Sequence, residues 1–122
     1  MEETNNMSDI DGIKYAIGIN NVLGDQALFK EILVMFYQEH NQDGQKIKRA
    51  IQVKDMAKAK SIAHTLKGVA SSVGAMDLYE VTRALDIAIG DNQADKLAAL
   101  LVNLLLEFDK VMQGISLKLN VN

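Results

Sequence analysis

Hydrophobic residues recur at helical spacing along most of this chain, with polar residues between them. The pattern is strongest in the C-terminal third, where apolar residues stand three or four positions apart at Leu97, Leu100, Leu101, Leu104, Leu105, Phe108, Val111, Met112 and Ile115. Residues at this spacing share one face of an α-helix. We therefore predict a long amphipathic helix that opens at Asp91 and buries this stripe.

The same spacing predicts two helices in the N-terminal half. A short helix, capped by Asp9 or Asp11, is expected to end near residues 20–21. One long helix is then expected from about Asp25 to Val53. A break at Gly44 is the alternative, because a polar and weakly helical stretch interrupts the apolar pattern there.

Two further helices are predicted in the middle of the chain. Asp55 is expected to cap a helix that runs to about Ser72 and stops at Gly74, because glycine is favoured just past a helix C-terminus. The next helix has Asp77 as its cap and Gly90 as its stop. Since short connections make successive helices antiparallel neighbours, the predicted fold is all-α: an antiparallel up-down four-helix bundle with a short extra N-terminal helix.

The composition is consistent with a single aliphatic core. The chain has 122 residues, of which 48% are hydrophobic and only 5% aromatic. It contains no proline, which favours long uninterrupted helices. We predict a polar tail over residues 1–8, one bundle domain over residues 9–118 and a C-terminal tail over residues 119–122.

Charge and cysteine content narrow the class of function. The formal net charge is −3 and we find no basic stripe, which argues against a nucleic-acid partner. No apolar run approaches the roughly 18 residues of a membrane span, and the polar N-terminus does not resemble a signal peptide. The absence of cysteine fits a reducing compartment. We expect a soluble, cytoplasmic monomer without a membrane partner.

The helix expected after Asp55 carries a histidine on its polar side. Its apolar stripe consists of Ile62, Leu66, Val69 and Val73, widened on one side by Ala59, Ala63 and Ala70. On a helical wheel His64 falls near the centre of the opposite side, among Lys60, Lys67, Gly68 and Ser71. Burying the stripe would expose the imidazole between two lysines and beside a residue without a side chain. This arrangement suits a surface nucleophile that receives a partner.

Several other roles for this histidine remain open on the pattern alone. A buried core histidine and an inert surface histidine are the simplest. A metal site would need companions, and the only other histidine, His40, lies in a polar stretch without ligand spacing, where a solvated position is expected. A catalytic triad is disfavoured because the nearby hydroxyl residues lie on helix turns without a strained elbow.

Residues 63–75, with the sequence AHTLKGVASSVGA, closely resemble the signature of histidine-containing phosphotransfer (HPt) domains. That signature has a histidine, a lysine and a glycine three and four residues later, small residues, and a second glycine ten residues after the histidine. The resemblance covers about residues 9–112. It includes the turn at residues 24–28 and the helix at residues 78–86.

The resemblance implies a helical bundle whose exposed histidine, here His64, carries a phosphoryl group on Nε2. It implies exchange of that group with the aspartate of a response-regulator receiver domain, and a hybrid sensor histidine kinase as a further partner. Family members leave Mg²⁺ to the receiver, so no cofactor or metal of this chain's own is expected. Because no P-loop or other nucleotide loop is present, the expected activity is that of a phosphotransfer carrier and not of a kinase.

The resemblance also assigns roles around this histidine. Lys67 is expected to place its ammonium beside the phosphoryl oxygens. Gly68 is expected to leave clearance for the receiver, since a mid-helix glycine costs about 1 kcal/mol relative to alanine; close helix packing is the alternative. Asp86 stands where the family often has a glutamate or glutamine that bonds Nδ1 of the histidine. Because aspartate is one methylene shorter, a bridging water and a plain helix-surface position are its alternatives.

Two residues have less specific expectations. Lys60, one turn before the histidine, is expected to be a surface charge that steers partners. Ser71 is a candidate contact at the rim of the partner surface.

The rival function is a non-catalytic helical adaptor that binds a receiver or kinase domain, and a metal-binding bundle comes third.

Overall fold

The computed structural model describes residues 7–122, and nearly all of these lie in helices or short connections between them. The helices are α2 (Tyr15–Asn21), α3 (Gln26–His40), α4 (Asp43–Gln52), α5 (Met56–Val73), α6 (Met76–Gly90) and α7 (Ala94–Leu119). No strand occurs within the described range, so the predicted all-α class is confirmed. Residues 1–6 of the predicted polar tail lie outside this range.

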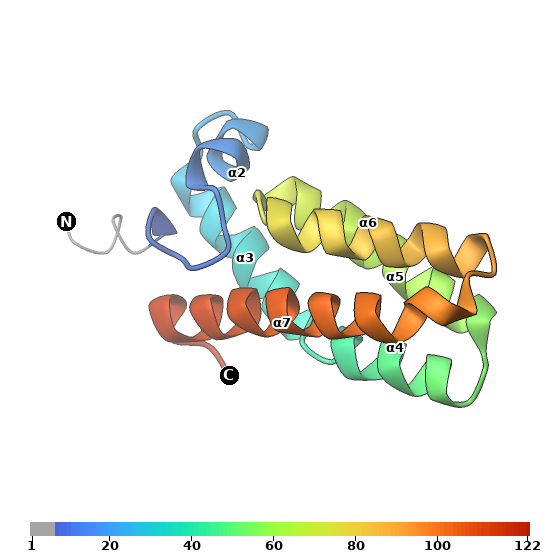
Figure 1. Ribbon diagram of the computed structural model, residues 1–122. Helices are drawn as coiled ribbons and strands as arrows, with labels where there is room; N and C mark the ends of the chain where they lie inside the picture. Colours follow the sequence, from blue (N-terminus) through green and yellow to red (C-terminus); the bar gives the residue numbers. More distant parts are fainter. Residues whose placement is uncertain (1–6) are drawn as a thin grey trace.

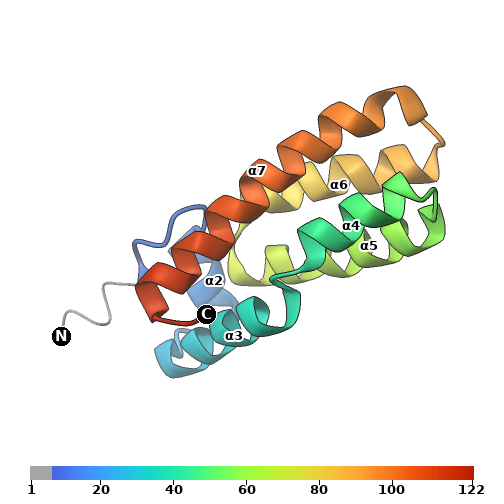
Figure 2. The ribbon, with the colours of Figure 1, turned by 90° about the horizontal axis from the view of Figure 1, so that it is seen from below.

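Helices α4 to α7 lie side by side in the part of the molecule away from the chain termini (Figures 1 and 2). In chain order they are α4, α5, α6 and α7, and each runs opposite to the one before it. α6 packs against both α5 and α7, and α4 packs against both α5 and α7. α3 leads into α4 and packs on α5 and α7, while α2 contacts α3 and the C-terminal part of α5.

The single helix expected over residues 25–53 is wrong, because α3 ends at His40 and α4 begins at Asp43. Side chains add hydrogen bonds at this break. Asn41 Nδ2 donates at 2.7 Å to the carbonyl oxygen of Tyr37, which also accepts from the Asn41 backbone N–H, and His40 Nδ1 lies 2.8 Å from Asp43 Oδ2. The alternative break at Gly44 is also misplaced, since this residue lies in the first turn of α4.

Gly44 has a packing role at the contact between α4 and α7. A Cβ atom added there would lie 2.9 Å from Cδ2 of Phe108 and 3.1 Å from Cδ2 of Leu105. These distances are shorter than ordinary carbon–carbon contacts. The missing side chain therefore lets α4 approach α7 closely.

The predicted signals at both ends of α5 are confirmed. Asp55 caps its N-terminus by accepting a hydrogen bond from the backbone N–H of Lys58, and Asp25 caps α3 in the same way through Leu28. Gly74 ends α5 in the left-handed conformation, with φ +84°. These caps fix the limits of the helix that carries His64.

The predicted caps of three other helices are wrong. α2 begins after Lys14, whose backbone N–H donates to the carbonyl oxygen of Gly74, so neither Asp9 nor Asp11 caps it.

The connections to α6 and α7 are very tight. The backbone N–H of Ala75 donates to the carbonyl oxygen of Ala70 at the end of α5, and that of Gln93 donates to the carbonyl oxygen of Ala88 at the end of α6.

The two residues that donate these backbone bonds also serve as the N-caps of the helices that follow. The N-caps of α6 and α7 are Ala75 and Gln93, in place of the expected Asp77 and Asp91. Asp77 lies instead in the first turn of α6, where a negative charge is favourable. Gly90 is the last residue of α6 and Asp91 its C-cap, so the predicted stop is nearly correct.

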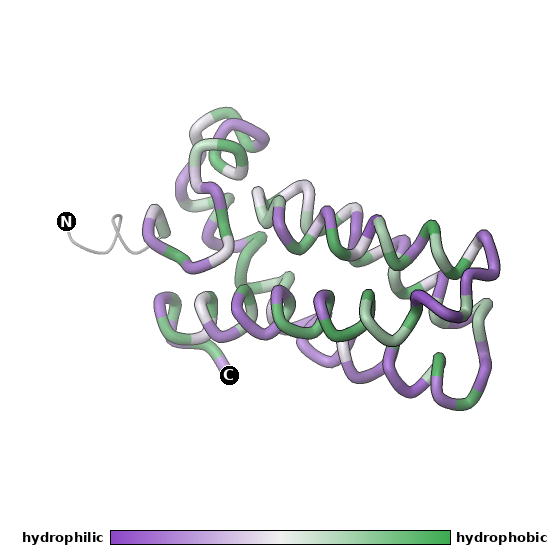
Figure 3. Tube along the Cα trace, viewed as in Figure 1, coloured by the Kyte–Doolittle hydropathy of each residue, from purple (hydrophilic) through white to green (hydrophobic). Residues whose placement is uncertain are grey.

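Hydrophilic and hydrophobic positions alternate along the helices (Figure 3). Buried apolar residues of these helices form one hydrophobic core. The predicted stripe of α7 lies in this core, with Leu97, Leu104, Phe108, Val111, Met112 and Ile115 buried. Met7 is buried as well, and Val121 packs against the core. Packed structure thus begins before residue 9 and continues past residue 118. Within residues 7–122, no helix combines the length and the apolar character needed to cross a bilayer.

Candidate functional site

The buried face of α5 is centred on small residues. Its fully buried members are Ala59, Ala63, Leu66, Ala70 and Val73, whereas Ile62 and Val69 are only partly buried. The core face is therefore rotated toward the alanines relative to the predicted stripe. Alanine allows α5 to pack closely against α6. The rotation of the core face brings the polar residues next to it to the border between α5 and α6.

The residue after each buried position forms a row along the border with α6, which contains Lys60, His64, Lys67 and Ser71. The imidazole of His64 is 74% exposed, so a buried core histidine is excluded. Gly68 lies farthest from the buried face, and a Cβ atom added there would meet nothing within 4 Å. The centre of the polar side is therefore Gly68, and His64 is displaced from it toward α6.

Asp86 on α6 holds the two lysines of this row. Lys60 Nζ donates to Oδ1 of Asp86 at 2.8 Å and lies 3.3 Å from its backbone carbonyl oxygen. Lys67 Nζ donates to Oδ2 at 3.0 Å. The Asp86 side chain is only 7% exposed, so it is not a plain helix-surface residue. One carboxylate thus joins two ammonium groups, one on each side of the histidine.

The same carboxylate lies near the imidazole without bonding to it. His64 Nδ1 is 3.9 Å from Oδ2 of Asp86, which is too long for a hydrogen bond. Both carboxylate oxygens already accept from lysines. Asp86 therefore lies beside the imidazole without bonding to it, and its direct partners are Lys60 and Lys67.

The charge state of Asp86 follows from this environment. Burial by itself raises the pKa of the Asp86 carboxyl. Hydrogen bonds and positive charges from Lys60 and Lys67 outweigh burial and hold the pKa below its ordinary value. Asp86 is consequently ionised at neutral pH, and the site contains two ammonium groups and one carboxylate.

The surroundings of the imidazole are hollow on one side. An open depression of about 470 Å³ is lined by Ala57, Lys60, Ser61, His64 and Thr65. Ser61 and Thr65 did not stand out in the sequence as neighbours of this surface, although Ser61 lies one turn before His64 and Thr65 directly follows it, both on the exposed side of α5. Ser71 is half-buried, and its neighbour Ser72 donates from Oγ to the carbonyl oxygen of Gly68 at 3.0 Å.

A sequence model of the Hpt domain matches residues 31–114, which include most of α3 and α7 and all of α4, α5 and α6. The chain belongs to the Hpt family. Comparisons with curated proteins and with solved structures gave no significant match. Family membership assigns this domain to phosphotransfer in two-component systems.

Positive charge is concentrated on one part of this Hpt domain. Residues 44–67 contain seven of the 13 Lys and Arg residues and a single acidic residue, Asp55. Lys46, Arg49 and Lys58 line a cavity of about 370 Å³ between α4 and α5, together with Asp55. None of these three cations has an ion-pair partner among residues 7–122. We call the two cations of α4, Lys46 and Arg49, the basic corner; they form a local basic surface that the sequence analysis overlooked.

The second histidine of the Hpt domain occupies a different kind of position. His40 closes α3, where its ring stacks at a tilt on Phe36 with centroids 5.8 Å apart, and it pairs with the buried Asp43. It is therefore partly buried and not the solvated residue that was expected. In the described part of the chain, no three His, Cys, Asp or Glu side chains come together as a metal-ligand set.

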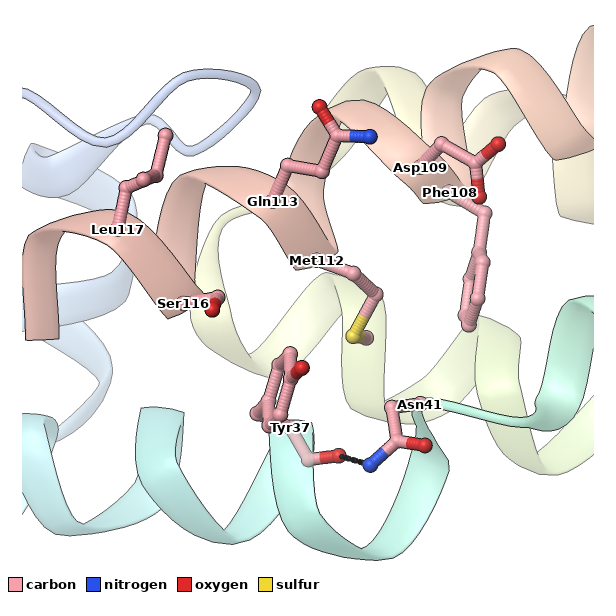
Figure 4. Close-up of a pocket in the computed structure, with 8 residues that line it drawn as sticks. All are labelled: Tyr37, Asn41, Phe108, Asp109, Met112, Gln113, Ser116 and Leu117. Atoms are coloured by element: carbon pink, nitrogen blue, oxygen red, sulfur yellow. Dashed lines mark hydrogen bonds between the residues drawn. The ribbon is translucent and has the colours of Figure 1, made fainter. Parts of the chain in front are cut away.

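A separate cavity of about 340 Å³ lies between α3 and α7 (Figure 4). Its lining includes Tyr37, Phe108 and Met112, and Asn41 donates its hydrogen bond to the Tyr37 carbonyl at one edge. It contains no lysine, arginine or histidine. The charged groups of the domain that suit phosphoryl chemistry thus lie along α5 and α6.

Proposed function

We propose that this Hpt domain accepts a phosphoryl group on Nε2 of His64 and donates it in turn, exchanging it with the aspartate of response-regulator receiver domains. The observation that carries the proposal is the exposure of this one imidazole between Lys60 and Lys67, next to the open space at Gly68. His40, the only other histidine, is partly buried and paired with Asp43.

The proposed step is a displacement at phosphorus. The lone pair of Nε2 forms the N–P bond while the P–O bond to the receiver's aspartate breaks, and that aspartate leaves as a carboxylate. Nδ1, which lies 3.9 Å from Oδ2 of Asp86, keeps its proton during this step. The reverse step restores the neutral imidazole. Such a reaction depends mainly on alignment and on stabilisation of charge.

The neighbouring residues support this step in different ways. Lys67 supplies a positive charge one turn from His64. Gly68 supplies clearance, because an exposed position with no neighbours gains nothing from glycine in the free domain. Ser71 is proposed as a contact at the rim of the partner surface. Asp86 acts on the imidazole through its charge and through the two lysines that it binds.

The proposal also covers the partners of the domain, the source of Mg²⁺ and the arrangement of its helices. Its partners are a receiver domain and a hybrid sensor kinase, and Mg²⁺ enters with the receiver, whose carboxylates hold it. In this interpretation α3 and α4 form one interrupted member of an antiparallel four-helix bundle, and α2 is the short extra helix. A monomeric state and a cytoplasmic location stay predictions from the sequence.

The test uses a receiver domain phosphorylated on its aspartate, with Mg²⁺, as the donor. We expect one acid-labile and base-stable label on this protein, mapped by mass spectrometry to His64. His64→Gln should abolish the label, while His40→Gln, the matched control at the only other histidine, should retain it. The melting temperature of His64→Gln should stay within a degree or two of the wild type, because the side chain is exposed.

Two results would contradict the proposal. Labelling of His64→Gln at an unchanged level would show that another residue accepts the phosphoryl group. A domain that binds the receiver but never becomes labelled would be the non-catalytic adaptor.

A further inference from the structure

We propose that Lys60 is a second phosphoryl-binding residue of this domain and that Asp86 is the positioning residue that holds Lys60 and Lys67 ready beside the imidazole. The inference rests on the proposed function, because it requires a phosphoryl group on His64. It assigns to Lys60 a direct contact in place of the long-range steering expected from the sequence.

The geometry places both ammonium groups symmetrically about the histidine. Lys60 precedes His64 by one helical turn and Lys67 follows it by one turn, so both lie on the same side of α5. Their Nζ atoms lie 2.8 Å and 3.0 Å from the two oxygens of one carboxylate, and Nδ1 of the histidine is 3.9 Å from that carboxylate. Three cationic or potentially cationic groups therefore surround Asp86.

The structure also provides room for Lys60 at this place. A Cβ atom on Gly90 would lie 3.1 Å from Nζ and 3.7 Å from Cε of Lys60, so a larger residue there would crowd the ammonium. Gly90 is the last residue of α6, and a cation near the C-terminus of a helix is favoured by the helix dipole. The carbonyl oxygen of Asp86, 3.3 Å from Nζ, lies one turn before this end of the helix.

Burial differs between the two partners of the ion pair. The Lys60 side chain is 49% exposed, whereas the Asp86 side chain is 7% exposed. The carboxylate is thus fixed within the structure, while the long lysine side chain can turn toward solvent and toward a group bound at His64. Lys60 also lines the depression beside the imidazole, so it already borders the space that a phosphoryl group would enter.

Charge balance gives a reason for this movement. The resting site carries two ammonium groups and one carboxylate, a net charge of +1. The bound phosphoryl group carries a charge of about −1.5 to −2 on three acceptor oxygens, while the imidazole ring that keeps its Nδ1 proton gains one positive charge. Lysines that share one carboxylate before transfer therefore gain stronger acceptors after it. Asp86 keeps the two cations close to His64 without neutralising them completely.

The test uses phosphoramidate as a small phosphoryl donor, so that docking of a receiver plays no part. The N–P bond to His64 forms as the P–N bond of the zwitterionic donor breaks, and ammonia leaves. We compare the wild type with Lys60→Gln, Lys60→Arg and the control Lys58→Gln, an exposed lysine of α5 that makes no ion pair within residues 7–122. The measurements are the labelling rate by intact mass and the titration of the phosphoryl group by ³¹P NMR.

We expect Lys60→Gln to slow labelling by about two- to fivefold, a size typical of a solvent-exposed charge interaction. The phosphoryl group should also titrate at higher pH in this variant, because a nearby cation favours its dianion. Lys60→Arg, which keeps the positive charge, should largely recover the wild-type labelling rate and the wild-type ³¹P titration. Lys58→Gln should change neither the rate nor the titration. A purely structural role for Lys60 would leave the ³¹P titration unchanged.

A double-mutant comparison tests the part assigned to Asp86. If Asp86 holds Lys60 in place, Lys60→Gln should have a smaller effect in an Asp86→Asn background than in the wild type. Equal effects in both backgrounds would overturn the positioning role. Identical behaviour of Lys60→Gln and Lys58→Gln would overturn the phosphoryl contact. Failure of the wild type to accept any label at His64, from phosphoramidate or from a receiver, would instead refute the proposed function.

Discussion

Lys67 donates a hydrogen bond to Asp86 at 3.0 Å, from α5 across to the neighbouring helix α6. The lysine that the sequence signature pairs with the histidine is therefore also paired with a buried carboxylate in the resting domain. Its side chain is only 24% exposed, which is less than a freely solvated lysine would be. This ion pair between α5 and α6 exists only while the carboxyl group of Asp86 is ionised.

This link makes the stability of the domain depend on acid pH. Because Lys60 and Lys67 hold the pKa of Asp86 below its value in the unfolded chain, the carboxylate stabilises the fold above that ordinary value, and this contribution is lost as pH falls through the lowered pKa. We expect Asp86→Asn to have a lower melting temperature than the wild type at pH 7. The difference should shrink as pH falls below about 4.

Asp109→Asn is the matched control for that experiment, since Asp109 is an exposed aspartate in the interior of α7 with no ion pair in the described part of the chain. Its melting temperature should follow the wild type across the same pH range. A constant difference between Asp86→Asn and the wild type from pH 7 to pH 3 would contradict the ion-pair assignment.

Substitutions at Gly68 separate stability from partner access. Gly68→Ala should raise the free energy of unfolding by about 0.5–1 kcal/mol, because the position is helical and nothing opposes a Cβ atom there. Gly68→Gln should also be at least as stable as the wild type. Transfer from a receiver should nevertheless slow strongly for glutamine and moderately for alanine. A Gly68→Gln variant with full transfer activity would refute the clearance role.

The same substitution at Gly44 should have the opposite effect on stability. A Cβ atom there would meet the ring of Phe108 at 2.9 Å, so overpacking should outweigh the gain in helix propensity. We expect Gly44→Ala to lower the free energy of unfolding by about 1–3 kcal/mol. Denaturant melts of Gly44→Ala and Gly68→Ala, measured side by side, compare two glycines of the same chain. Stabilisation at Gly44 would mean that α4 and α7 are less closely packed than described.

The basic corner should affect encounter with an acidic partner. Lys46→Glu combined with Arg49→Glu should slow transfer from a receiver at low salt, and the difference from the wild type should shrink as ionic strength rises, because screening weakens exposed charges. The control pair, Lys14→Glu with Lys96→Glu, changes the net charge equally in other parts of the domain, at the N-cap of α2 and in α7. Equal slowing by both pairs would indicate an effect of net charge alone.

Much of this site could be predicted from sequence because it depends on one helix. The alternation of apolar and polar residues in α5, its cap at Asp55 and its end at Gly74 determine that His64 faces solvent. These are local properties, and the histidine signature lies entirely within them. The position of Gly68 opposite the buried face followed from the same spacing.

The parts that could not be predicted depend on contacts between helices. The rotation of α5 toward its alanines is set by packing against α6, and this rotation brings Lys60 and Lys67 to Asp86. The break between α3 and α4 depends on side-chain bonds around Asn41 and on the close approach of Gly44 to α7. Helical periodicity contains no information about such partners, because it describes one helix at a time.

His64 lies midway along α5, between the caps at Asp55 and Gly74. The field of a helix macrodipole acts on charges within the first and last turns and is weak at the centre. A negative group added at the midpoint is therefore neither favoured nor opposed by the helix, in contrast to the strong anion binding of helix N-termini. The helix backbone would therefore neither stabilise nor destabilise a phosphoryl group held there. The direction of transfer would be determined by the difference in free energy between the phosphorylated states of the two partners that exchange it.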